Sequence, residues 1–324
     1  MTARRTAPLL FNNTTPTAVV TRMRSGGTRG SAWSASAASV CAAPAKRWSS
    51  NSSVTVKLNY QIRHPSGRRT GRYIGRPDLG DVVDEYSPGT ATINDARLLG
   101  VPPSLASHGF ELRHAPTSVA DFSHPLAVKE GYYAETEVLV KAATGAGEVL
   151  VFDHTLRTSG NVNPNAVAGA TSAAPAVRVH CDYTVDSAPR RLEQLIGADR
   201  IRDEIGDRRF AFLNVWRSID IEHPVMRQPL ACLAPQSVDD SDRFLYHLLF
   251  PTRAGENYSL VHSESHLWYY FPLMTADEVM LFSVYDRQAD TPRFVFHTAF
   301  DLPHTPSDAP PRRSIELRTI AIWE

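Results

Sequence analysis

A histidine and an aspartate separated by one residue, His180 and Asp182, carry the most informative chemistry in this chain. They lie in AVRVHCDY, residues 176–183, a segment that reads as a β-strand. Because side chains on a strand alternate between its two faces, the imidazole and the carboxylate project from the same side. His297, in FVFHTAF at residues 294–300, could join them from a distant strand. Two histidines and one carboxylate that leave open positions are the ligand set of non-haem Fe(II) oxygenases.

An arginine and a serine follow in PRRSIELR, residues 311–318, which again alternates like a strand. Arg312 and Ser314 would share a face of that strand. A guanidinium binds a carboxylate through two N–H groups, and a neighbouring hydroxyl can add a hydrogen bond. The pair therefore suits the distal carboxylate of 2-oxoglutarate. Two alternatives stay open: Arg312 could instead pair with Glu316, and the anchor could be Arg313 or Arg318.

Two groups of polar and aromatic residues are candidates for ligand contacts. An amide, an indole and a guanidinium close together could line a substrate pocket, because ligand sites combine a few directed polar groups with an apolar wall. These three residues are Asn214, Trp216 and Arg217. The second group could border the cosubstrate, and it comprises His266, Tyr269 and Tyr270. For Trp216 and for this second group, the alternative is an ordinary place in the apolar core.

A competing metal site could be formed by His262, Glu264 and His266, which alternate onto one face of an expected strand. Three ligands from one straight strand would spread over about 13 Å at roughly 3.3 Å per residue, which is too far for one ion unless the strand has a bulge. We therefore rank this site below the first one.

A further polar cluster is expected near the middle of the chain, at Asp153, His154 and Arg157. Asp153 could orient His154 or pair with Arg157. We interpret this cluster as a buried structural network.

Several motifs occur in the order found in a known family. Besides the segments above, the chain carries VFDHTLR (151–157), NVWR (214–217), HLWYYFP (266–272) and DEV (277–279), followed by a Tyr-Asp pair. Together they resemble the fungal and bacterial hydroxylase/desaturase family typified by AsaB, gibberellin desaturase and the CmcJ cephalosporin methoxylase component. The resemblance runs from about Val54 to Arg318. Arg313 stands where the family often has glutamate, and it would face away from Arg312.

This resemblance implies an Fe(II)/2-oxoglutarate dioxygenase with a double-stranded β-helix (jelly-roll) core. Carried over, the metal ligands would be His180, Asp182 and His297, with Arg312 and Ser314 holding the cosubstrate. Dioxygen and 2-oxoglutarate would be consumed, and succinate and carbon dioxide released, as hydrogen is removed from an unactivated carbon. The outcome would be hydroxylation or desaturation of a small, mostly apolar natural product, in secondary metabolism.

The formal net charge of zero hides an asymmetry along the chain. Residues 1–77 hold 13 of the 34 basic residues and no acidic one, which leaves 21 basic against 34 acidic residues in 78–324, a formal charge of −13. Such a body would repel nucleic acid, so we expect no nucleic-acid partner. No apolar run approaches the roughly 20 residues that span a bilayer, so we expect no membrane partner. The sequence carries no indication of the oligomeric state.

The N-terminal segment, residues 1–52, is rich in Arg, Ser, Thr and Ala and lacks acidic residues. This composition is typical of a disordered tail or a mitochondrial transit peptide. Residues 53–324 are expected to form a single domain. Three cysteines, Cys41, Cys181 and Cys232, are odd in number and lack a Cys-x-x-Cys pair, which favours a reducing compartment. We expect the cytoplasm, with the mitochondrion as the alternative.

The coarse pattern predicts a mainly β protein with flanking helices. Helical spacing is expected at 121–143 and 188–210, an irregular arm at 63–88, and a loop at 158–175. Strands are expected at 54–60, 148–154, 212–216, 244–250, 260–271, 278–285, 293–300 and 314–323. Many short strands separated by Pro and Gly turns favour a jelly roll with helices on its flank.

Two other classes of function are compatible with the sequence alone. A non-catalytic jelly-roll protein that binds a small molecule would keep the fold and the aromatic pocket but would release no succinate. A metal-dependent hydrolase would use a Lewis-acidic metal and water, and its activity would survive without dioxygen or 2-oxoglutarate. A serine hydrolase is not favoured, because the chain has no Gly-x-Ser-x-Gly motif.

Overall fold

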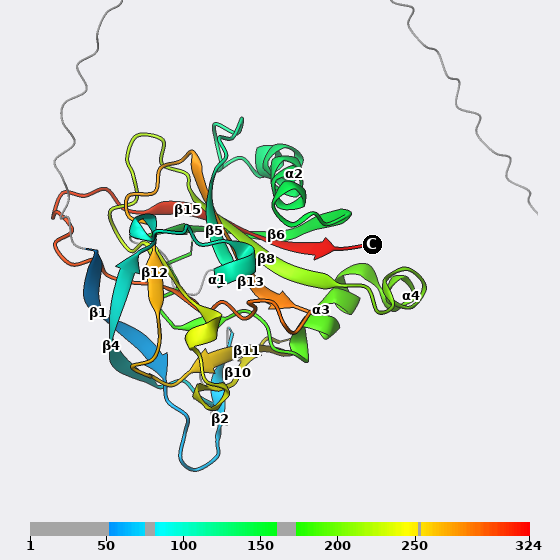
Figure 1. Ribbon diagram of the computed structural model, residues 1–324, viewed down its shortest axis with the longest axis horizontal. Helices are drawn as coiled ribbons and strands as arrows, with labels where there is room; N and C mark the ends of the chain where they lie inside the picture. Colours follow the sequence, from blue (N-terminus) through cyan, green and yellow to red (C-terminus); the bar gives the residue numbers. More distant parts are fainter. Residues whose placement is uncertain (1–51, 75–81, 161–172, 252–253) are drawn as a thin grey trace, which may run out of the picture. The chain divides into compact units, whose positions relative to one another are not determined.

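The computed structural model describes residues 52–74, 82–160, 173–251 and 254–324, all within one compact unit, Ser50–Glu324. In these residues strands dominate and form two sheets, as Figure 1 shows. No helix among them is long and apolar enough to cross a bilayer.

The larger sheet contains ten strands of the described chain, in the order β1-β4-β12-β9-β14-β7-β11-β10-β2-β3. Most neighbours are antiparallel, while β12 runs parallel to β4, and β2 runs parallel to both β10 and β3. The strands are β1 (Ser53–Gln61), β2 (Arg69–Tyr73), β3 (Val82–Val83), β4 (Tyr86–Asp95), β7 (His180–Cys181), β9 (Leu230–Leu233), β10 (Arg243–Leu249), β11 (Ala254–Leu260), β12 (Trp268–Tyr270) and β14 (His297–Ala299).

The smaller sheet is antiparallel, with the order β5-β13-β8-β15-β6 among the described strands. Its strands are β5 (Phe110–His114), β6 (Glu148–Thr158), β8 (Phe210–Ser218), β13 (Glu278–Asp286) and β15 (Arg313–Ile322). The chain passes repeatedly between the sheets: β6, β8, β13 and β15 belong to the smaller sheet, and β7, β9 and β14 to the larger one. This winding is the jelly-roll arrangement that the sequence predicts.

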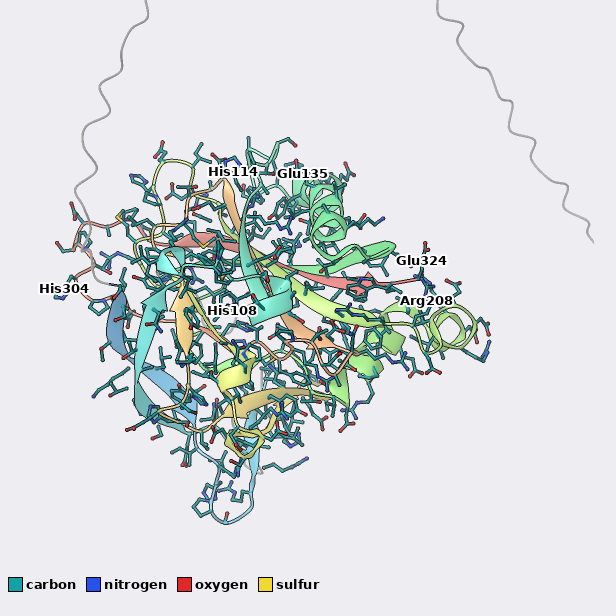
Figure 2. All side chains as sticks on the ribbon, in the orientation of Figure 1. His108, His114, Glu135, Arg208, His304 and Glu324 are labelled. Carbon is teal, nitrogen blue, oxygen red and sulfur yellow. The ribbon has the colours of Figure 1, made fainter. Side chains whose placement is uncertain are left out.

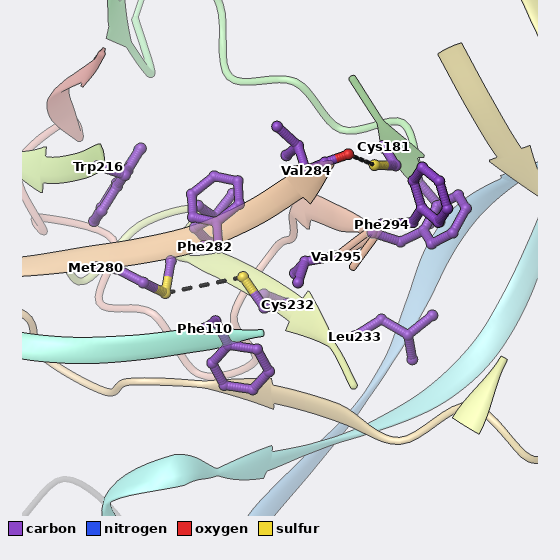
Figure 3. Close-up of a cluster of buried hydrophobic side chains, with 14 of the residues drawn as sticks. Phe110, Cys181, Trp216, Cys232, Leu233, Met280, Phe282, Val284, Phe294 and Val295 are labelled. Carbon is purple, nitrogen blue, oxygen red and sulfur yellow. Dashed lines mark hydrogen bonds between the residues drawn. The ribbon is translucent and has the colours of Figure 1, made fainter. Parts of the chain in front are cut away.

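The main core fills the space between the two sheets. Alternate residues of β8 and β13, among them Phe212, Trp216, Met280 and Phe282, pack with side chains of the larger sheet such as Cys232. Figure 3 shows this cluster of aromatic, aliphatic and sulfur-containing side chains. The alternation assigns each residue of a strand to the inner or the outer face of the smaller sheet.

Helices cover the outer face of the smaller sheet. A π-helical turn, η2 (Ala127–Tyr132), continues into α2 (Tyr133–Thr144), which lies beside β6 and β15 in Figure 1. Val128 and Val140 bury their side chains against the outward residues of the sheet, such as Leu317. Helix α2 ends at Gly145, whose φ of 70° is the left-handed conformation that glycine adopts without steric cost.

The other helices are short. They are η1 (Ala96–Leu98), α1 (Leu105–His108), α3 (Ser187–Ile196), α4 (Ala198–Arg200), η3 (Ile201–Ile205), η4 (Pro235–Ser237) and η5 (Asp240–Asp242). The helix predicted at 188–210 is therefore interrupted, because Gly197 adopts a φ of 87° between α3 and α4. The helix predicted at 121–143 is confirmed but begins later, at Ala127.

Most predicted strands are confirmed with shifted ends, and three are wrong in extent. Residues 260–271 are not one strand, because β11 ends at Leu260 and β12 begins at Trp268. Between them the hydroxyls of Ser263 and Ser265 hydrogen-bond to each other at 2.8 Å, a local alternative to a strand ladder. The other two are the segment at 176–183, of which only His180–Cys181 is a strand, and the segment at 293–300, of which only His297–Ala299 is one.

The two segments predicted to be irregular are partly regular or lie outside the described residues. The arm at 63–88 contains β2, β3 and the first residues of β4, while its residues 75–81 are not described. Of the loop at 158–175, residues 161–172 are likewise outside the described part.

Candidate functional site

His180, Asp182 and His297 meet, as the sequence predicts. One potential donor atom from each lies within 4.8 Å of the other two. His180 in β7 pairs directly with His297, the first residue of β14, and their ring centroids are 4.4 Å apart. Asp182 follows on the same side of the chain as His180. In the described part of the chain this is the one group of three or more His, Cys, Asp or Glu residues that could hold a metal ion.

Both histidines use the same ring nitrogen for a backbone contact. Nδ1 of His180 lies 2.7 Å from the carbonyl oxygen of Arg178, and Nδ1 of His297 lies 3.2 Å from that of Val295. A carbonyl can only accept, so each Nδ1 carries the hydrogen and each Nε2 keeps a free lone pair. Backbone contacts of this kind orient metal-binding histidines.

The two oxygens of Asp182 have different surroundings. Oδ1 lies 3.5 Å from Nε2 of His180, whereas Oδ2 accepts a hydrogen bond of 2.8 Å from the amide of Asn214. Nε of Arg318 lies 3.6 Å from the same Oδ2. One carboxylate oxygen is thus held by the protein, and the other faces the histidines.

The electrostatics of the group favour a carboxylate at Asp182 and a neutral imidazole at His180. Burial by itself raises the pKa of the Asp182 carboxyl, but the guanidinium of Arg318 and the histidines outweigh burial and hold that pKa well below its usual range. Burial, followed by the neighbouring His297, lowers the pKa of His180 well below 6.5. An ionised carboxylate and a neutral imidazole are the forms that bind a metal.

Arg312 and Ser314 are buried, with exposed fractions of 4% and 0%. Nη1 of Arg312 donates to the carbonyl oxygen of Gln228 at 2.6 Å. Nε of Arg312 and Oγ of Ser314 have no hydrogen-bond partner among the described residues. Burial, with a contribution from Arg157, lowers the pKa of Arg312 to about 9. An unpaired donor on a buried cation, with an unpaired hydroxyl two residues away, fits an incoming carboxylate, so these residues suit a dicarboxylate cosubstrate.

Open space adjoins this arginine. A cavity of about 710 Å³ has Ser159, Gln228 and Pro311 in its wall, and the backbone N–H of Arg312 donates to Oγ of Ser159 at 2.6 Å. Val177, three residues before His180, lines the same cavity. The cavity is therefore lined by residues that contact or adjoin Arg312, whereas Arg312 itself and the three predicted metal ligands are not in its wall.

The three residues predicted to line the substrate pocket do not lie on one face. Asn214 and Trp216 are on the inner face of β8, where Asn214 contacts Asp182 and the Trp216 ring centroid lies 5.5 Å from the guanidinium carbon of Arg312. Arg217 is on the outer face, over the ring of Tyr132 at 5.0 Å. The inclusion of Arg217 is therefore corrected, because neighbouring residues on a strand point to opposite sides.

The residues predicted to border the cosubstrate contact other aromatic side chains. Tyr269 packs against Phe110 and against His108 of α1; His108 is labelled in Figure 2. Among the described residues, no hydrogen bond or ring contact joins Tyr269 to Arg312 or Ser314. His266 stacks on Tyr60. Tyr270 packs against Phe300.

The competing metal site is not assembled. Nε2 of His262 contacts the carbonyl oxygen of Thr90 at 2.8 Å, and Nε2 of His266 lies 3.3 Å from Asp242. The residues 261–267 lie between strands, so the alternation expected there does not occur.

The polar cluster predicted at residues 153–157 is divided by the sheet. Asp153 pairs with Arg318 at 3.2 Å on the inner face, whereas His154 contacts the hydroxyl of Tyr133 in α2 at 2.8 Å. Arg157 donates to the carbonyl oxygen of Ala174. Asp153 therefore neither orients His154 nor pairs with Arg157.

Arg318 is the site residue whose role the sequence does not reveal directly. The sequence offers it only as an alternative anchor for the cosubstrate, yet it lies beside Asp182. A signal for its place is present, because Arg312, Ser314, Glu316 and Arg318 occupy every second position of one segment.

Comparisons with known proteins find relatives among iron- and 2-oxoglutarate-dependent enzymes. Residues 58–322 match a family model described as an oxidoreductase/YMDC permease-like domain. Hydroxylase/desaturase efuI of Hormonema carpetanum is 32% identical over 76% of this chain and 88% of that protein. The Fe(II)/2-oxoglutarate-dependent dioxygenase nvfI of Aspergillus novofumigatus is 31% identical over 77% of this chain and 88% of that protein. A solved structure of a variant of the iron and alpha-ketoglutarate-dependent endoperoxidase NvfI superimposes with a TM-score of 0.75 at 27% identity, covering 85% of this chain and 98% of that one.

Proposed function

The chain belongs to the hydroxylase/desaturase family of Fe(II)/2-oxoglutarate-dependent dioxygenases, and we propose that His180, Asp182 and His297 are the residues with which it binds iron. It is an oxidoreductase that uses Fe(II), 2-oxoglutarate and dioxygen on a small-molecule substrate. The observation that carries the proposed ligand set is the convergence of three donor atoms within 4.8 Å. Free Nε2 atoms on both histidines and an ionised Asp182 support it.

Arg312 and Ser314 are the proposed anchor for the distal carboxylate of 2-oxoglutarate. Their unpaired donors support this role, as does the absence of any carboxylate within ion-pair distance of Arg312 in the described residues. Trp216 forms an apolar wall beside the guanidinium. A bound carboxylate there would restore the charge balance of a cation whose burial is otherwise unfavourable.

Iron held by His180, Asp182 and His297 would, with 2-oxoglutarate and dioxygen, supply the oxidising chemistry that removes hydrogen from an unactivated carbon and converts 2-oxoglutarate to succinate and carbon dioxide. The protein provides orientation and a protected site. Asn214 and the backbone carbonyls of Arg178 and Val295 hold the proposed ligands in register. The packed core between the sheets keeps bulk water from their sides.

The substrate is a small natural product, in line with relatives named for hydroxylation, desaturation and biosynthesis. An apolar molecule is the proposed class, because an apolar side chain packs beside the histidines: the buried ring of Phe282 lies 4.7 Å from that of His297. Hydroxylation and desaturation differ in how the substrate's hydrogens are presented to the oxidant.

An anaerobic spectroscopic titration tests the ligand set. Purified protein with Fe(II) and 2-oxoglutarate is expected to give a weak visible charge-transfer band, and the Asp182→Ala and His297→Ala variants are expected to lose it. The matched control is His262→Ala, which changes a histidine of the competing site and should keep the band. A band that persists in Asp182→Ala, or disappears in His262→Ala, would contradict the assignment.

Activity is tested with the same protein. In air, with ascorbate, 2-oxoglutarate and a panel of fungal metabolites, we expect succinate release coupled to a product that has gained one oxygen atom or lost two hydrogen atoms, seen by mass spectrometry. Turnover that continues without dioxygen or 2-oxoglutarate would instead indicate a hydrolase.

The cytoplasm is the proposed compartment, with the mitochondrion as the alternative raised by residues 1–52. Cys181 and Cys232 support a reducing compartment, since both are buried free thiols. Fluorescent fusions of the full chain and of residues 53–324 compare the two: mitochondrial fluorescence that needs residues 1–52 would overturn the cytoplasmic proposal.

A further inference from the structure

The inward residues in the first part of β15, from Ser314 to Arg318, form a polar row. Ile315 and Leu317 face outward and pack in the cluster beneath α2. Ser314, Glu316 and Arg318 therefore face inward, on the side of the proposed cosubstrate anchor. At the far end of this row from Arg312, the guanidinium of Arg318 reaches Asp182.

Arg318 is held by residues of two strands. Its Nη1 donates to Thr155 Oγ1 at 3.0 Å and to Asp153 Oδ2 at 3.2 Å, both on β6. Its Nη2 donates to Oε1 of Glu316 at 3.1 Å. With both terminal nitrogens engaged in this way, the remaining Nε is directed toward Oδ2 of Asp182, 3.6 Å away. A planar fork held at several points can place one nitrogen accurately, which a lysine cannot do.

A carboxylate can turn about its Cβ–Cγ bond, so the free oxygen of Asp182 faces the histidines only if the other oxygen is held. Asn214 at 2.8 Å and Arg318 at 3.6 Å are the contacts to that other oxygen among the described residues. They come from β8 and β15, two neighbouring inner strands of the smaller sheet, which pair along nine residues. Both holders thus belong to a rigid element.

We propose that Arg318, together with Asn214, is a positioning residue that holds Oδ2 of Asp182 and so presents Oδ1 to the metal. This inference rests on the proposed ligand set. It concerns the contacts of Arg318 and Asn214 with Asp182, and not the binding of the metal by Asp182 itself. The positioning role can therefore be disproved while the ligand set stands.

Cobalt(II) provides a probe independent of turnover. We expect Arg318→Gln to bind Co(II) 10- to 100-fold more weakly than the unchanged protein and to show an altered visible d–d spectrum, because the carboxylate is no longer held. Arg318→Lys keeps the charge but not the fork, and we expect it to recover only part of the affinity. If the arginine acted only through its charge, Lys would match the unchanged protein, and Gln would bind Co(II) more tightly because a nearby cation is removed.

The matched control is Arg209→Gln, which removes an arginine paired with buried Asp286 at 2.7 Å and should leave Co(II) affinity unchanged. Near-ultraviolet circular dichroism of each variant reports its folding. Should Arg318→Gln not fold, Asn214→Leu removes the other donor to Oδ2 and must still weaken Co(II) binding.

Equal affinity in the folded Arg318 variants, or tighter binding by Arg318→Gln, would overturn the positioning role. Failure of the unchanged protein to bind Co(II) would instead overturn the ligand set, and the positioning role with it.

Discussion

Arg312 is a buried guanidinium with one described hydrogen bond to a carbonyl and an unpaired Nε. Buried cations are normally paired, so a cation without its own carboxylate indicates a ligand that brings one. Arg313, its neighbour, is exposed and faces the other way. The difference between two adjacent arginines follows from strand alternation alone.

Substituting Arg312 tests whether its guanidinium binds the carboxylate of 2-oxoglutarate. Arg312→Lys keeps a cation but loses the fork, and we expect the KM for 2-oxoglutarate to rise about 10- to 100-fold, as the loss of a charge-assisted hydrogen bond of about 1.5–3 kcal/mol implies. Initial rates of succinate release at varied 2-oxoglutarate measure it. Arg313→Lys is the control and should leave KM unchanged; an unchanged KM in Arg312→Lys would exclude this arginine as the anchor.

Ser314 contributes a neutral hydroxyl, so its effect should be smaller. Ser314→Ala removes an unpaired buried oxygen and one potential hydrogen bond to the cosubstrate. We expect the KM for 2-oxoglutarate to rise about 2- to 10-fold, in line with a net contribution of about 0.5–1.5 kcal/mol for a neutral hydrogen bond. Initial rates of succinate release at varied 2-oxoglutarate measure this KM as well. A fall in KM would show that the hydroxyl does not contact the cosubstrate.

Among the secondary-structure elements, the smaller sheet must stay in place beneath the helices for the site to form. Strands β8 and β15 carry Asn214 and Arg318 on one face and the apolar residues of the outer cluster on the other. Helix α2 and the π-helical turn before it cover that outer face. Packing behind the sheet therefore supports the polar contacts in front of it.

A pair of valines on α2 tests this packing. Val140 is fully buried, whereas Val138 is 69% exposed. We expect Val140→Ala to lower the free energy of unfolding by about 2 kcal/mol, since it removes two buried carbons and leaves a cavity. Val138→Ala should change it by less than about 0.5 kcal/mol. Urea unfolding followed by circular dichroism measures both, and equal effects would contradict the described packing.

Across the molecule, three histidines are buried or half-buried, and their surroundings favour the neutral form. Burial is the main cause that lowers the pKa of His180, His154 and His266. In the unfolded chain these residues return to pKa values near 6.5. Below that pH the unfolded state takes up protons that the folded state does not, so the stability is fully present above about pH 6.5 and is lost as the pH falls.

The metal-free protein should therefore lose stability between about pH 7 and pH 5.5. Each such histidine contributes at most about 1.4 kcal/mol per pH unit in that window. Urea midpoints measured with a chelator present test this. We expect His266→Gln to reduce the dependence, and His304→Gln, at an exposed position, to leave it unchanged. A midpoint that rises as the pH falls would refute the sign.

Residues 53–324 are proposed to fold as a single domain without residues 1–52. The described elements, from β1 at Ser53 to β15, belong to one compact unit. A chain that starts at Ser53 should therefore melt within about 2 °C of the full chain and bind Co(II) equally, because the one described contact it loses is the hydrogen bond from the Asp95 N–H to the carbonyl oxygen of Ser52. A markedly lower melting temperature would assign residues 1–52 a structural role.

Local sequence patterns are enough to establish which side chains share a face. Alternation places His180 with Asp182 and Arg312 with Ser314, and the same rule, applied to residues 214–217, separates Arg217 from Asn214. The mainly β pattern and the main helical segment at 121–143 were also predictable, since they depend on local periodicity and turn residues. The ends of the strands were less predictable, because pairing with distant partners shortens β7 to two residues and β14 to three.

Which faces meet depends instead on long-range packing. His297 joins His180 because β14 pairs with β7, across more than a hundred residues of sequence. Arg318 reaches Asp182 because the two sheets pack with β15 opposite β7, and His266 is drawn toward Asp242 and Tyr60 for a similar reason. Such contacts depend on the register and packing of segments far apart in the chain, which local periodicity does not encode.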